Sequence, residues 1–574
     1  MHGLWTHAAH EKRGVADKAA GEGAESLLMT RNNFFYRPAV IGSRLNAFFT
    51  KNDYLHTARF ARLHELTDST IPRDAITGKN TAILLARTSY DRLLCAKPTK
   101  TQRELGHVLL VGKHRSGKGL NIETNLLTWP FSAIINDIKG EHWHRNSGFR
   151  QEGLGGKSLR FDPRGFGCRY DPLEGKTTDL ELRSAATTLL HNPHEGQNAS
   201  FIERATTMLV AIFTAAILEG ERTLPFTYKL MNEGLYATAS ILEIITRKHN
   251  AYPNLAKKFL DTDYDKADFE SKFLQDCWST LTARMSKILT RESVRCFTGS
   301  DFSAKVIITS KTPISVYLSW PEEHILSLAP LIQLVWDSLI NGMLGYYDHP
   351  DVQGKGCRRV LCVLDEIFRT GLPKLPEYTT TVSGRNISFL ISSQSIAQME
   401  KAYDRPTAEV LLGQMDATVF YRTAAADNAT PEYIERSCGY TSGFAHSKTA
   451  HDKSTSKGES EQRVPLMPTH ETRHMDASEI IGLVNGLHPI REKRLNRYDF
   501  PELTKRGDMP APELLPLPES DLTVNKQGHQ SLPPLPDGRA GYSDDHRNHT
   551  TNGHTLWRSN RKFPKGYIDP DKRY

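Results

Sequence analysis

Cysteine and long apolar runs are both scarce in this sequence. Seven cysteines occur in 574 residues, and none forms a C-x-x-C pair. An odd, scattered set predicts neither a disulfide framework nor a cysteine zinc site, and it fits a reducing cytoplasm. The longest apolar run, Met208 to Leu218, is shorter than the roughly 20 residues that span a bilayer, so we interpret it as a buried helix. The polar start, His2 to Glu25, has no signal-peptide apolar region, and we expect a soluble chain.

A large excess of one charge is also missing. The chain has 73 Lys and Arg against 66 Asp and Glu, a net charge of +7. This mild excess permits a nucleic-acid or anionic-membrane partner without arguing for one. With 38% hydrophobic and 24% charged residues, the composition is that of a globular protein, and the length allows two or three domains.

What the sequence does contain is a strand, a glycine-rich turn and a helix in succession, from Gly106 to Leu120 onward. The apolar run His107 to Val111 predicts a buried parallel strand, and residues 121–127 predict a helix. The turn matches G-x-x-x-x-G-K, in which backbone N–H groups and the helix N-terminus bind a polyphosphate while the lysine reaches its β- and γ-phosphates. The predicted nucleotide-binding residues are Gly112, Lys113, His114, Arg115, Ser116, Gly117, Lys118 and Gly119.

One position departs from this motif. Gly119 stands where a hydroxyl that binds Mg²⁺ is usual. The cation must therefore be held in another way, through water or through Ser116. A glycine-rich turn with an incidental lysine is the alternative, and the flanking strand and helix disfavour it.

A second nucleotide motif is the acidic pair Asp365-Glu366, which follows the five apolar residues 360–364 of a predicted strand. The first carboxylate is predicted to bind Mg²⁺ directly or through water, and the second to accept a proton from the attacking water. Strands that merely end in acids are common. The upstream loop is what favours a catalytic interpretation here.

Further polar residues flank neighbouring strands. Gln394 follows the apolar strand 387–393, where an amide is predicted to sense the γ-phosphate or to orient water. Arg385 precedes the same strand and is predicted to act as an arginine finger on a neighbouring subunit's nucleotide. A surface or structural role is the alternative for both. Three residues after strand 132–136 are predicted to line the crevice at the carboxyl edge of the sheet, namely Asp137, Lys139 and Glu141. A solvated loop is the alternative.

The composition also suggests how the chain is divided. Strand and helix patterns alternate over residues 56–176 and 298–505, whereas residues 177–297 show helix patterns alone and predict an inserted all-α domain. Such an insertion selects substrates or partners, and a purely structural role is the alternative. Residues 441–461 are predicted to form a Ser/Lys/His-rich loop, and the Pro-rich residues 506–574 a flexible tail. We assign no role to residues 1–55.

Two histidine patterns are not interpreted as metal sites. His470-Glu-Thr-Arg-His474 spells H-E-x-x-H, but Pro468 precedes it and no third histidine follows at family spacing, so we interpret it as a chance match. His142-Trp-His144 is predicted to be an exposed turn, because residues two apart do not share a helix face.

Several separated motifs together carry a family resemblance. They are Gly106-His-Val-Leu-Leu-Val-Gly112, Arg115-Ser-Gly-Lys-Gly119, Asn125-Leu-Leu-Thr-Trp-Pro130, Asp137-Ile-Lys-Gly-Glu141, Asp171-Pro-Leu173, Val316-Tyr-Leu318, Leu364-Asp-Glu366 and Gln394-Ser395. In this order, between about residues 55 and 505, they resemble the type IV secretion coupling proteins of the TraG/TraD conjugation kind. Gly119, unusual for the general motif, is at home among such relatives.

This resemblance implies an α/β, RecA-like P-loop ATPase that uses ATP and Mg²⁺, carries the all-α insertion and assembles as a homo-hexamer. It further implies a motor that links a relaxase–DNA complex, or protein substrates, to a type IV secretion channel. At the matching positions the catalytic roles go to Lys118, Asp365, Glu366, Arg385 and Gln394.

The family usually has N-terminal transmembrane helices, and residues 1–55 offer none. We therefore expect a cytoplasmic protein, tethered at the cytoplasmic face of the inner membrane by a separate anchor subunit or not tethered at all. Two alternatives stay open. One is an FtsK- or HerA-like DNA translocase not tied to secretion, and the other is a substrate-recruiting adaptor with weak ATPase activity.

Overall fold

The computed structural model describes residues 56–77, 81–98, 104–191, 199–451 and 454–519. By its internal contacts the chain divides into two units. Among the described residues, the smaller unit contains residues 56–57 and 440–464, and the remainder forms the larger unit. The predicted N-terminal region, residues 1–55, lies outside the described residues.

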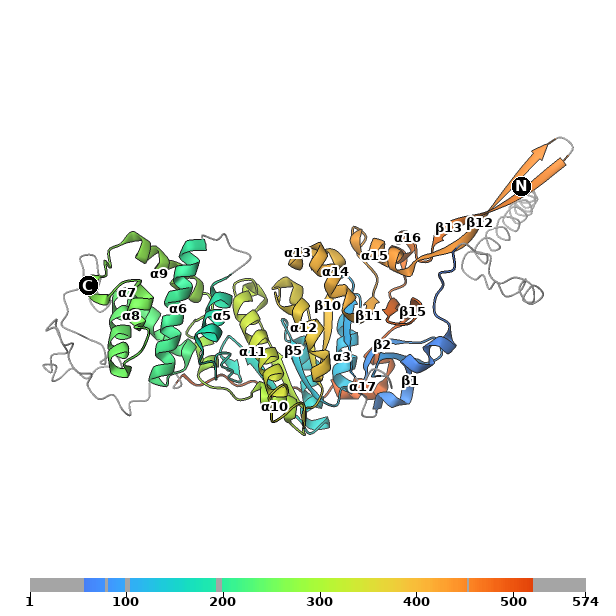
Figure 1. Cartoon of the computed structure of the whole chain (residues 1–574). Helices are drawn as coiled ribbons and strands as arrows, with labels where there is room; N and C mark the ends of the chain where they lie inside the picture. The colour runs from blue at the N-terminus through green and yellow to red at the C-terminus, as the bar shows by residue number, and fades with distance from the viewer. Residues whose placement is uncertain (1–55, 78–80, 99–103, 192–198, 452–453, 520–574) are drawn as a thin grey trace, which may run out of the picture. The chain divides into compact units, whose positions relative to one another are not determined.

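A thirteen-stranded mixed sheet organises the larger unit (Figure 1). Its central strands are parallel and apolar, as expected where helices cover both faces of a sheet. In spatial order they are β11 (Met415–Phe420), β4 (His107–Val111), β10 (Ile387–Ser393), β9 (Val360–Leu364), β5 (Ser132–Asn136), β8 (Ile314–Leu318) and β6 (Lys157–Asp162). The α/β prediction is thereby confirmed.

Antiparallel strands extend the sheet at both ends. Beyond β11 they are β14 (Glu479–Val484), β15 (Ile490–Arg494), β2 (Ile83–Arg87), β3 (Arg92–Ala96) and β1 (Thr70–Pro72), and beyond β6 there is the short β7 (Phe166–Gly167). Because β4, β9 and β10 are parallel, their carboxyl ends meet at one edge of the sheet. The glycine-rich loop, the acidic pair and Gln394 all follow strands that end at this edge.

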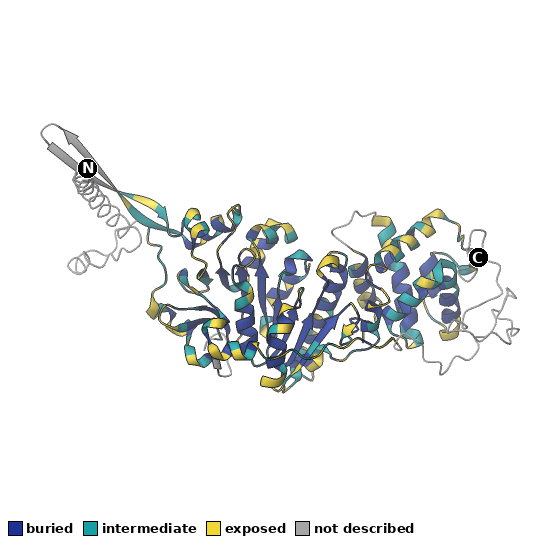
Figure 2. Ribbon diagram, turned by 180° about the vertical axis from the view of Figure 1, so that it is seen from behind, coloured by how far each residue is buried: buried dark blue, intermediate teal, exposed yellow. Residues whose placement is uncertain are grey.

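Helices cover the two faces of the sheet, and alternate residues of each strand point to opposite faces. In β4, Leu109 and Val111 pack in one apolar cluster with α11, whereas Val108 and Leu110 pack in another with α3. The strands between these layers are buried (Figure 2). The helices outside the insertion are α3 (Lys118–Thr128), α4 (Glu141–Gly148), α10 (Ala304–Thr309), α11 (Ala329–Tyr347), α12 (Leu375–Thr381), α13 (Ile396–Tyr403), α14 (Arg405–Gly413), α15 (Ala429–Cys438), α16 (Thr469–His474) and α17 (Pro501–Gly507).

The region between β7 and β8 is helical. It contains α5 (Asp179–Leu190), α6 (Ala199–Glu219), α7 (Thr223–His249), α8 (Leu255–Leu260) and α9 (Lys272–Met285). The segments by which the chain enters and leaves these helices run beside each other. Tyr170 donates its N–H to the carbonyl of Cys296 at 2.8 Å, and Arg169 pairs with Asp301 at 3.0 Å.

Helix α6 has the length and composition of a membrane span, with 21 residues and a mean hydropathy of 1.7 in its most apolar window. The apolar run noted in the sequence, residues 208–218, is thus only the second half of this helix. Of that window 56% is buried inside the structure, and α6 packs against α5, α7, α8 and α9. It therefore has the surroundings of the core helix of a folded domain.

The predicted loop at residues 441–461 is wrong. The chain forms two long antiparallel strands there, β12 (Tyr440–His451) and β13 (Ser454–Pro465). Near their base the guanidinium of Arg463 stacks on the ring of Tyr440, 3.5 Å from its centroid. A two-stranded ribbon has no buried face to impose apolar alternation, so its polar composition resembles that of a loop.

The predicted flexible tail begins too early. Residues 506–519 are packed on the body, and residues 520–574 lie outside the described part of the chain. Leu517 is 8% exposed and donates its N–H to the carbonyl of Gly165, while Leu515 accepts from Gly167 at 2.9 Å. Glu519 then pairs with Arg295 at 2.8 Å. Residues 508–519, which we call the strap, thus add a strand-like stretch to the β7 edge.

His107, at the start of β4, makes stability depend on pH. Its Nδ1 accepts the N–H of Phe389 at 3.0 Å, and its Nε2 lies 3.0 Å from the carbonyl of Thr379, so the ring is held neutral with its proton on Nε2. Burial lowers the pKa of His107 to about 4, against about 6.5 in an unfolded chain. The neutral ring therefore contributes stability that is fully present above about pH 6.5 and is lost as the pH falls toward 4.

We expect the free energy of unfolding of the wild type to fall by about 3 kcal/mol more between pH 7 and pH 4 than that of His107→Gln, which does not titrate. Urea unfolding at pH 7, 6, 5 and 4 measures the difference. Parallel pH profiles for the two proteins would contradict the neutral, buried state of His107.

Candidate functional site

The glycine-rich loop after β4 closes around the side chain of Lys118, the first residue of α3. The Lys118 ammonium donates to the carbonyls of Gly112 and, at 3.1 Å, of Lys113. Burial lowers the pKa of Lys118, while the nearby carboxylates of Asp365 and Glu366 act in the opposite direction. The amine of the loop and the acids after β9 therefore lie close enough to interact, as the nucleotide interpretation requires.

Two glycines of the loop cannot carry a side chain without rearrangement. Gly117 has φ of +109°, a left-handed conformation that only glycine adopts at little cost. A Cβ on Gly112 would lie 2.7 Å from the Cβ of Tyr421. The loop thus approaches β11 closely at one end and turns sharply into α3 at the other, which directs its backbone amides inward.

There is open space around Gly119, the position at which the motif usually has a hydroxyl. A Cβ built on Gly119 meets nothing within 4 Å. The hydroxyl of Ser116 is buried in the same loop and has no hydrogen-bond partner within the described residues. A buried hydroxyl oxygen without a partner and a carboxylate oxygen are both donors that Mg²⁺ accepts. Ser116 and Asp365 therefore fit the cation that the sequence predicts.

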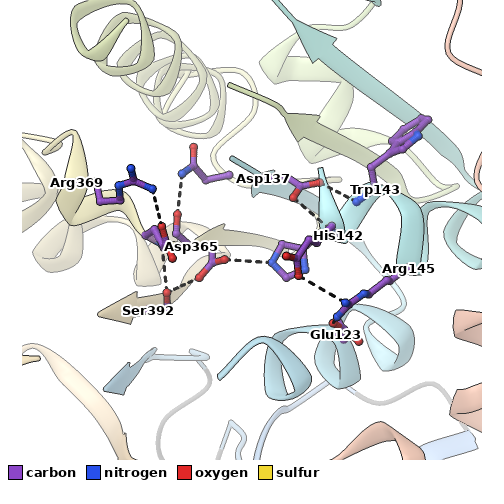
Figure 3. Close-up of polar contacts among 11 residues, drawn as sticks. Glu123, Asp137, His142, Trp143, Arg145, Asp365, Arg369 and Ser392 are labelled. Atoms are coloured by element: carbon purple, nitrogen blue, oxygen red, sulfur yellow. Dashed lines mark hydrogen bonds and ion pairs between the residues drawn. The ribbon is translucent and has the colours of Figure 1, made fainter. Parts of the chain in front are cut away.

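The acidic pair is fixed by one hydroxyl of β10 (Figure 3). Ser392, fully buried, donates to Oδ1 of Asp365 and accepts the N–H of Glu366 at 3.2 Å. Glu366 has φ of +52°, an uncommon value for a residue with a side chain. Ser392 thus holds both the first carboxylate and the left-handed backbone of the second acid.

The expectation for His142 is wrong. It was predicted in an exposed turn, but it is 4% exposed and its Nε2 lies 3.3 Å from Oδ2 of Asp365. Burial alone would lower its pKa, but the carboxylates of Asp365 and Asp137 outweigh burial and raise the pKa of His142 to about 9. Burial likewise acts to raise the pKa of Asp365, and His142, Ser392 and Lys118 together hold it below its usual range.

Asp137 supports this histidine from the backbone side. Its carboxylate accepts the N–H of His142 at 3.1 Å and that of Trp143 at 2.7 Å, so it caps the start of α4. The other two residues predicted to line the crevice, Lys139 and Glu141, are exposed. Asp137 therefore positions the site. The pKa of Glu322 is lowered first by its hydrogen bond with Arg369, and the positive charge of the nearby Lys139 also acts to lower it.

A second buried carboxylate lies behind His142. Glu123 of α3 is 1% exposed, accepts from Arg145 of α4 and pairs with Arg497 at 3.0 Å. These two cations compensate the buried charge of Glu123 and tie α3 to α4. The helix that carries Lys118 is thereby fixed to the helix that carries His142.

The two remaining predicted residues flank β10 at its opposite ends. Gln394 is exposed at the carboxyl end, beside the loop and the acids. Arg385 precedes the other end, where it pairs with Asp348 at 2.8 Å. Seven residues of strand separate the ends of β10 by roughly 20 Å. Arg385 is therefore not brought together with the loop of its own chain.

Four residues near the site had no signal in the sequence. Arg494 of β15 donates to the carbonyl of Ser116 at 3.3 Å, and Arg369 contacts Glu366 at 3.1 Å. Ser392 lies within an apolar strand and His142 in an i, i+2 pair, so neither belongs to a recognisable motif. Only the pairing of β9 with β10 and with β5 brings Ser392 and His142 to the acids.

Ser392→Ala removes two hydrogen bonds at once, one of them to a charged carboxylate. We expect a loss of about 1–3 kcal/mol in the free energy of unfolding, measured by urea unfolding without ligand. Ser393→Ala is the matched control, because this neighbouring hydroxyl contacts the carbonyl of Ser395 at 2.8 Å, the side chain of Gln398 at 3.2 Å and, among the described residues, no acid. Equal losses in the two variants would contradict the link between Ser392 and the acids.

Comparisons with known proteins agree with this geometry. The model of the family "Type IV secretory system Conjugative DNA transfer" matches residues 65–514. Protein VirD4 of Agrobacterium fabrum strain C58 is 27% identical over 449 residues, which cover 73% of this chain and 63% of VirD4. The conjugal transfer protein TraG of Escherichia coli is 24% identical over 454 residues, covering 71% and 69%. This chain thus spans less than two thirds of the length of VirD4.

Solved structures share the fold. The bacterial conjugative coupling protein TrwB, in a form with sulphate, has a TM-score of 0.55 at 14% identity, covering 78% of this chain and 95% of TrwB. TrwB in complex with ADP and Mg²⁺ has a TM-score of 0.50 at 16% identity, covering 68% and 84%. At these identities the likeness concerns the RecA-like fold alone. Because the family model matches most of the chain, the resemblance to coupling proteins is confirmed, and this protein belongs to the type IV secretory system conjugative DNA transfer family.

Proposed function

We propose that this protein is an ATP-hydrolysing coupling protein, which recruits a relaxase–DNA complex or protein substrates and drives them to a type IV secretion channel during conjugative transfer. The observation that carries the proposal is the convergence of Lys118 with Asp365 and Glu366 at one edge of the sheet. An amine and two acids at the carboxyl ends of parallel strands are the arrangement that phosphoryl transfer requires. Membership of the conjugative DNA transfer family supports the delivery role.

ATP and Mg²⁺ are the proposed ligands, supported by the loop geometry and by the complexes of TrwB with ADP and Mg²⁺ and with a non-hydrolysable ATP analogue. The amides of residues 112–119 would bind the phosphates, with Lys118 at the β- and γ-phosphates. Asp365 and Ser116 would hold Mg²⁺ directly or through water. Mg²⁺ supplies positive charge beside the transferring phosphoryl group.

The remaining catalytic roles are assigned to three other residues of the chain. Glu366 accepts a proton from the attacking water, and Gln394, exposed at the same edge, orients that water or contacts the γ-phosphate. Arg385 serves the nucleotide of a neighbouring subunit in a homo-hexamer, which agrees with its distance from the loop of its own chain. This subunit-to-subunit role makes assembly part of the site.

We further propose that DNA stimulates hydrolysis and that a separate anchor subunit holds the protein at the cytoplasmic face of the inner membrane. Phosphate contacts would supply most of the affinity for DNA, which therefore falls as salt rises. The relaxase and the channel components remain proposed partners.

Lys118→Ala tests the nucleotide chemistry. We expect phosphate release from ATP to fall at least about 100-fold, because Lys118 is the cation at the transferring phosphate. The assay is run with and without single- and double-stranded DNA, at low and high salt, with the thermal midpoint as a check on folding. Partner binding without any turnover in the wild type would favour an adaptor.

Capture of a relaxase tests the delivery role. The full chain, with and without ATP and Mg²⁺, is used to capture proteins encoded with the conjugative element, the Lys118→Ala variant serving as the nucleotide control. We expect a relaxase or another protein of the secretion apparatus in the captured material. DNA-stimulated turnover with no such partner would favour a translocase that is not tied to secretion.

A further inference from the structure

The side chain of Glu366 does not stand alone in the site. Its Oε2 lies 3.1 Å from Nη1 of Arg369, three residues later in the short 3₁₀ helix that follows the acidic pair. The same Nη1 lies 2.9 Å from Oε1 of Glu322. One guanidinium nitrogen therefore bridges two carboxylates that belong to different parts of the chain.

The bridge connects the ends of two strands. Glu322 follows β8, and Glu366 follows β9. The side chain of Glu366 is 17% exposed and that of Arg369 is 28% exposed, whereas Glu322 is half exposed, so the bridge runs from the interior of the site to its rim. Burial alone would lower the pKa of Arg369, and Glu322 and Glu366 outweigh burial and raise it, which keeps the guanidinium charged.

This arrangement bears directly on a proton acceptor. A glutamate side chain has three rotatable bonds, and fixing it costs up to about 2 kcal/mol. The left-handed backbone of Glu366, held by Ser392, sets the direction in which the side chain leaves the strand. The ion pair with Arg369 then restricts the position of the Glu366 carboxylate. A carboxylate already restricted in this way loses less entropy when it receives a proton from an oriented water.

We propose that Arg369 is a positioning residue for Glu366 and that Glu322 anchors it through their ion pair. The inference rests on the proposed function, since it assumes that Glu366 is the proton acceptor in ATP hydrolysis. It adds a cation supplied within the same chain, distinct from Arg385 at the other end of β10. Arg369 acts through Glu366 and does not bind the nucleotide.

Steady-state hydrolysis of Mg²⁺-ATP by the full chain tests this assignment. We expect Arg369→Ala to lower kcat about 10-fold and to change KM less than about 2-fold, because positioning affects the chemical step and not binding. Arg369→Lys, which keeps a cation near both carboxylates, should lose less than about 3-fold. Rescue by lysine would show that kcat depends on a cation near the two carboxylates and not on the planar shape of the guanidinium.

A double-mutant cycle tests the anchor. Glu322→Gln alone should lower kcat about 3-fold. The double variant Arg369→Ala/Glu322→Gln should be no slower than Arg369→Ala, because Glu322 acts only through Arg369. Arg405→Ala is the matched control, an exposed arginine that pairs with Glu409 at 3.4 Å on α14, away from the acids, and its kcat should match the wild type.

Other results would overturn the inference. A KM or a nucleotide dissociation constant raised more than about 5-fold by Arg369→Ala would make Arg369 a binding residue. An unchanged or increased kcat would show that the ion pair does not assist Glu366. Additive losses in the double variant would remove Glu322 from the mechanism. The wild type and Lys118→Ala are measured in the same assay, so a wild type without Lys118-dependent turnover identifies failure of the proposed function instead.

Discussion

The site depends on keeping one partly buried carboxylate charged. Asp365 loses hydration among apolar strands, and its charge persists because His142, Ser392 and Lys118 compensate for that loss. Each of these three partners comes from a different element: α4, β10 and α3. The order of the parallel strands is therefore a requirement of the site, because it brings the three partners to the end of β9. Removing one partner would leave a carboxylate without full compensation, which is costly in a protein interior.

The sequence predicted the parts of the site that are encoded locally. The glycine-rich loop and the acidic pair are each defined by a few consecutive residues whose spacing has a direct physical meaning, and the structure brings Lys118 and Asp365 together. His142 could not be predicted in the same way. The spacing rule for helix faces addresses contacts between His142 and His144, but the partner of His142 lies 223 residues away. Ser392 is similarly hidden in an apolar strand, where its hydroxyl is visible only once β9 is known to lie beside β10.

The two errors in the fold have a related cause. Polar composition predicted a loop at residues 441–461 and a flexible tail from residue 506, yet both segments contain paired backbone. Backbone hydrogen bonds do not depend on the side chain, so a two-stranded ribbon or an added edge strand leaves little trace in hydropathy. The central strands were predictable because they are buried on both faces. A strand that forms backbone hydrogen bonds without being buried on both faces lacks this apolar run in its sequence.

The way in which the helical region joins the sheet also limits how the protein can vary. The two linking segments are hydrogen-bonded to each other at Tyr170 and Cys296, and the strap contacts both of them, through Gly167 and through Arg295. The inserted helices are thus joined to the sheet at this hydrogen-bonded junction, and α5 also packs against α11. A change in the length of an exposed loop within the insertion is therefore expected to leave the pairing of β4, β9 and β10 unaltered, provided that the junction and the contact of α5 with α11 are kept.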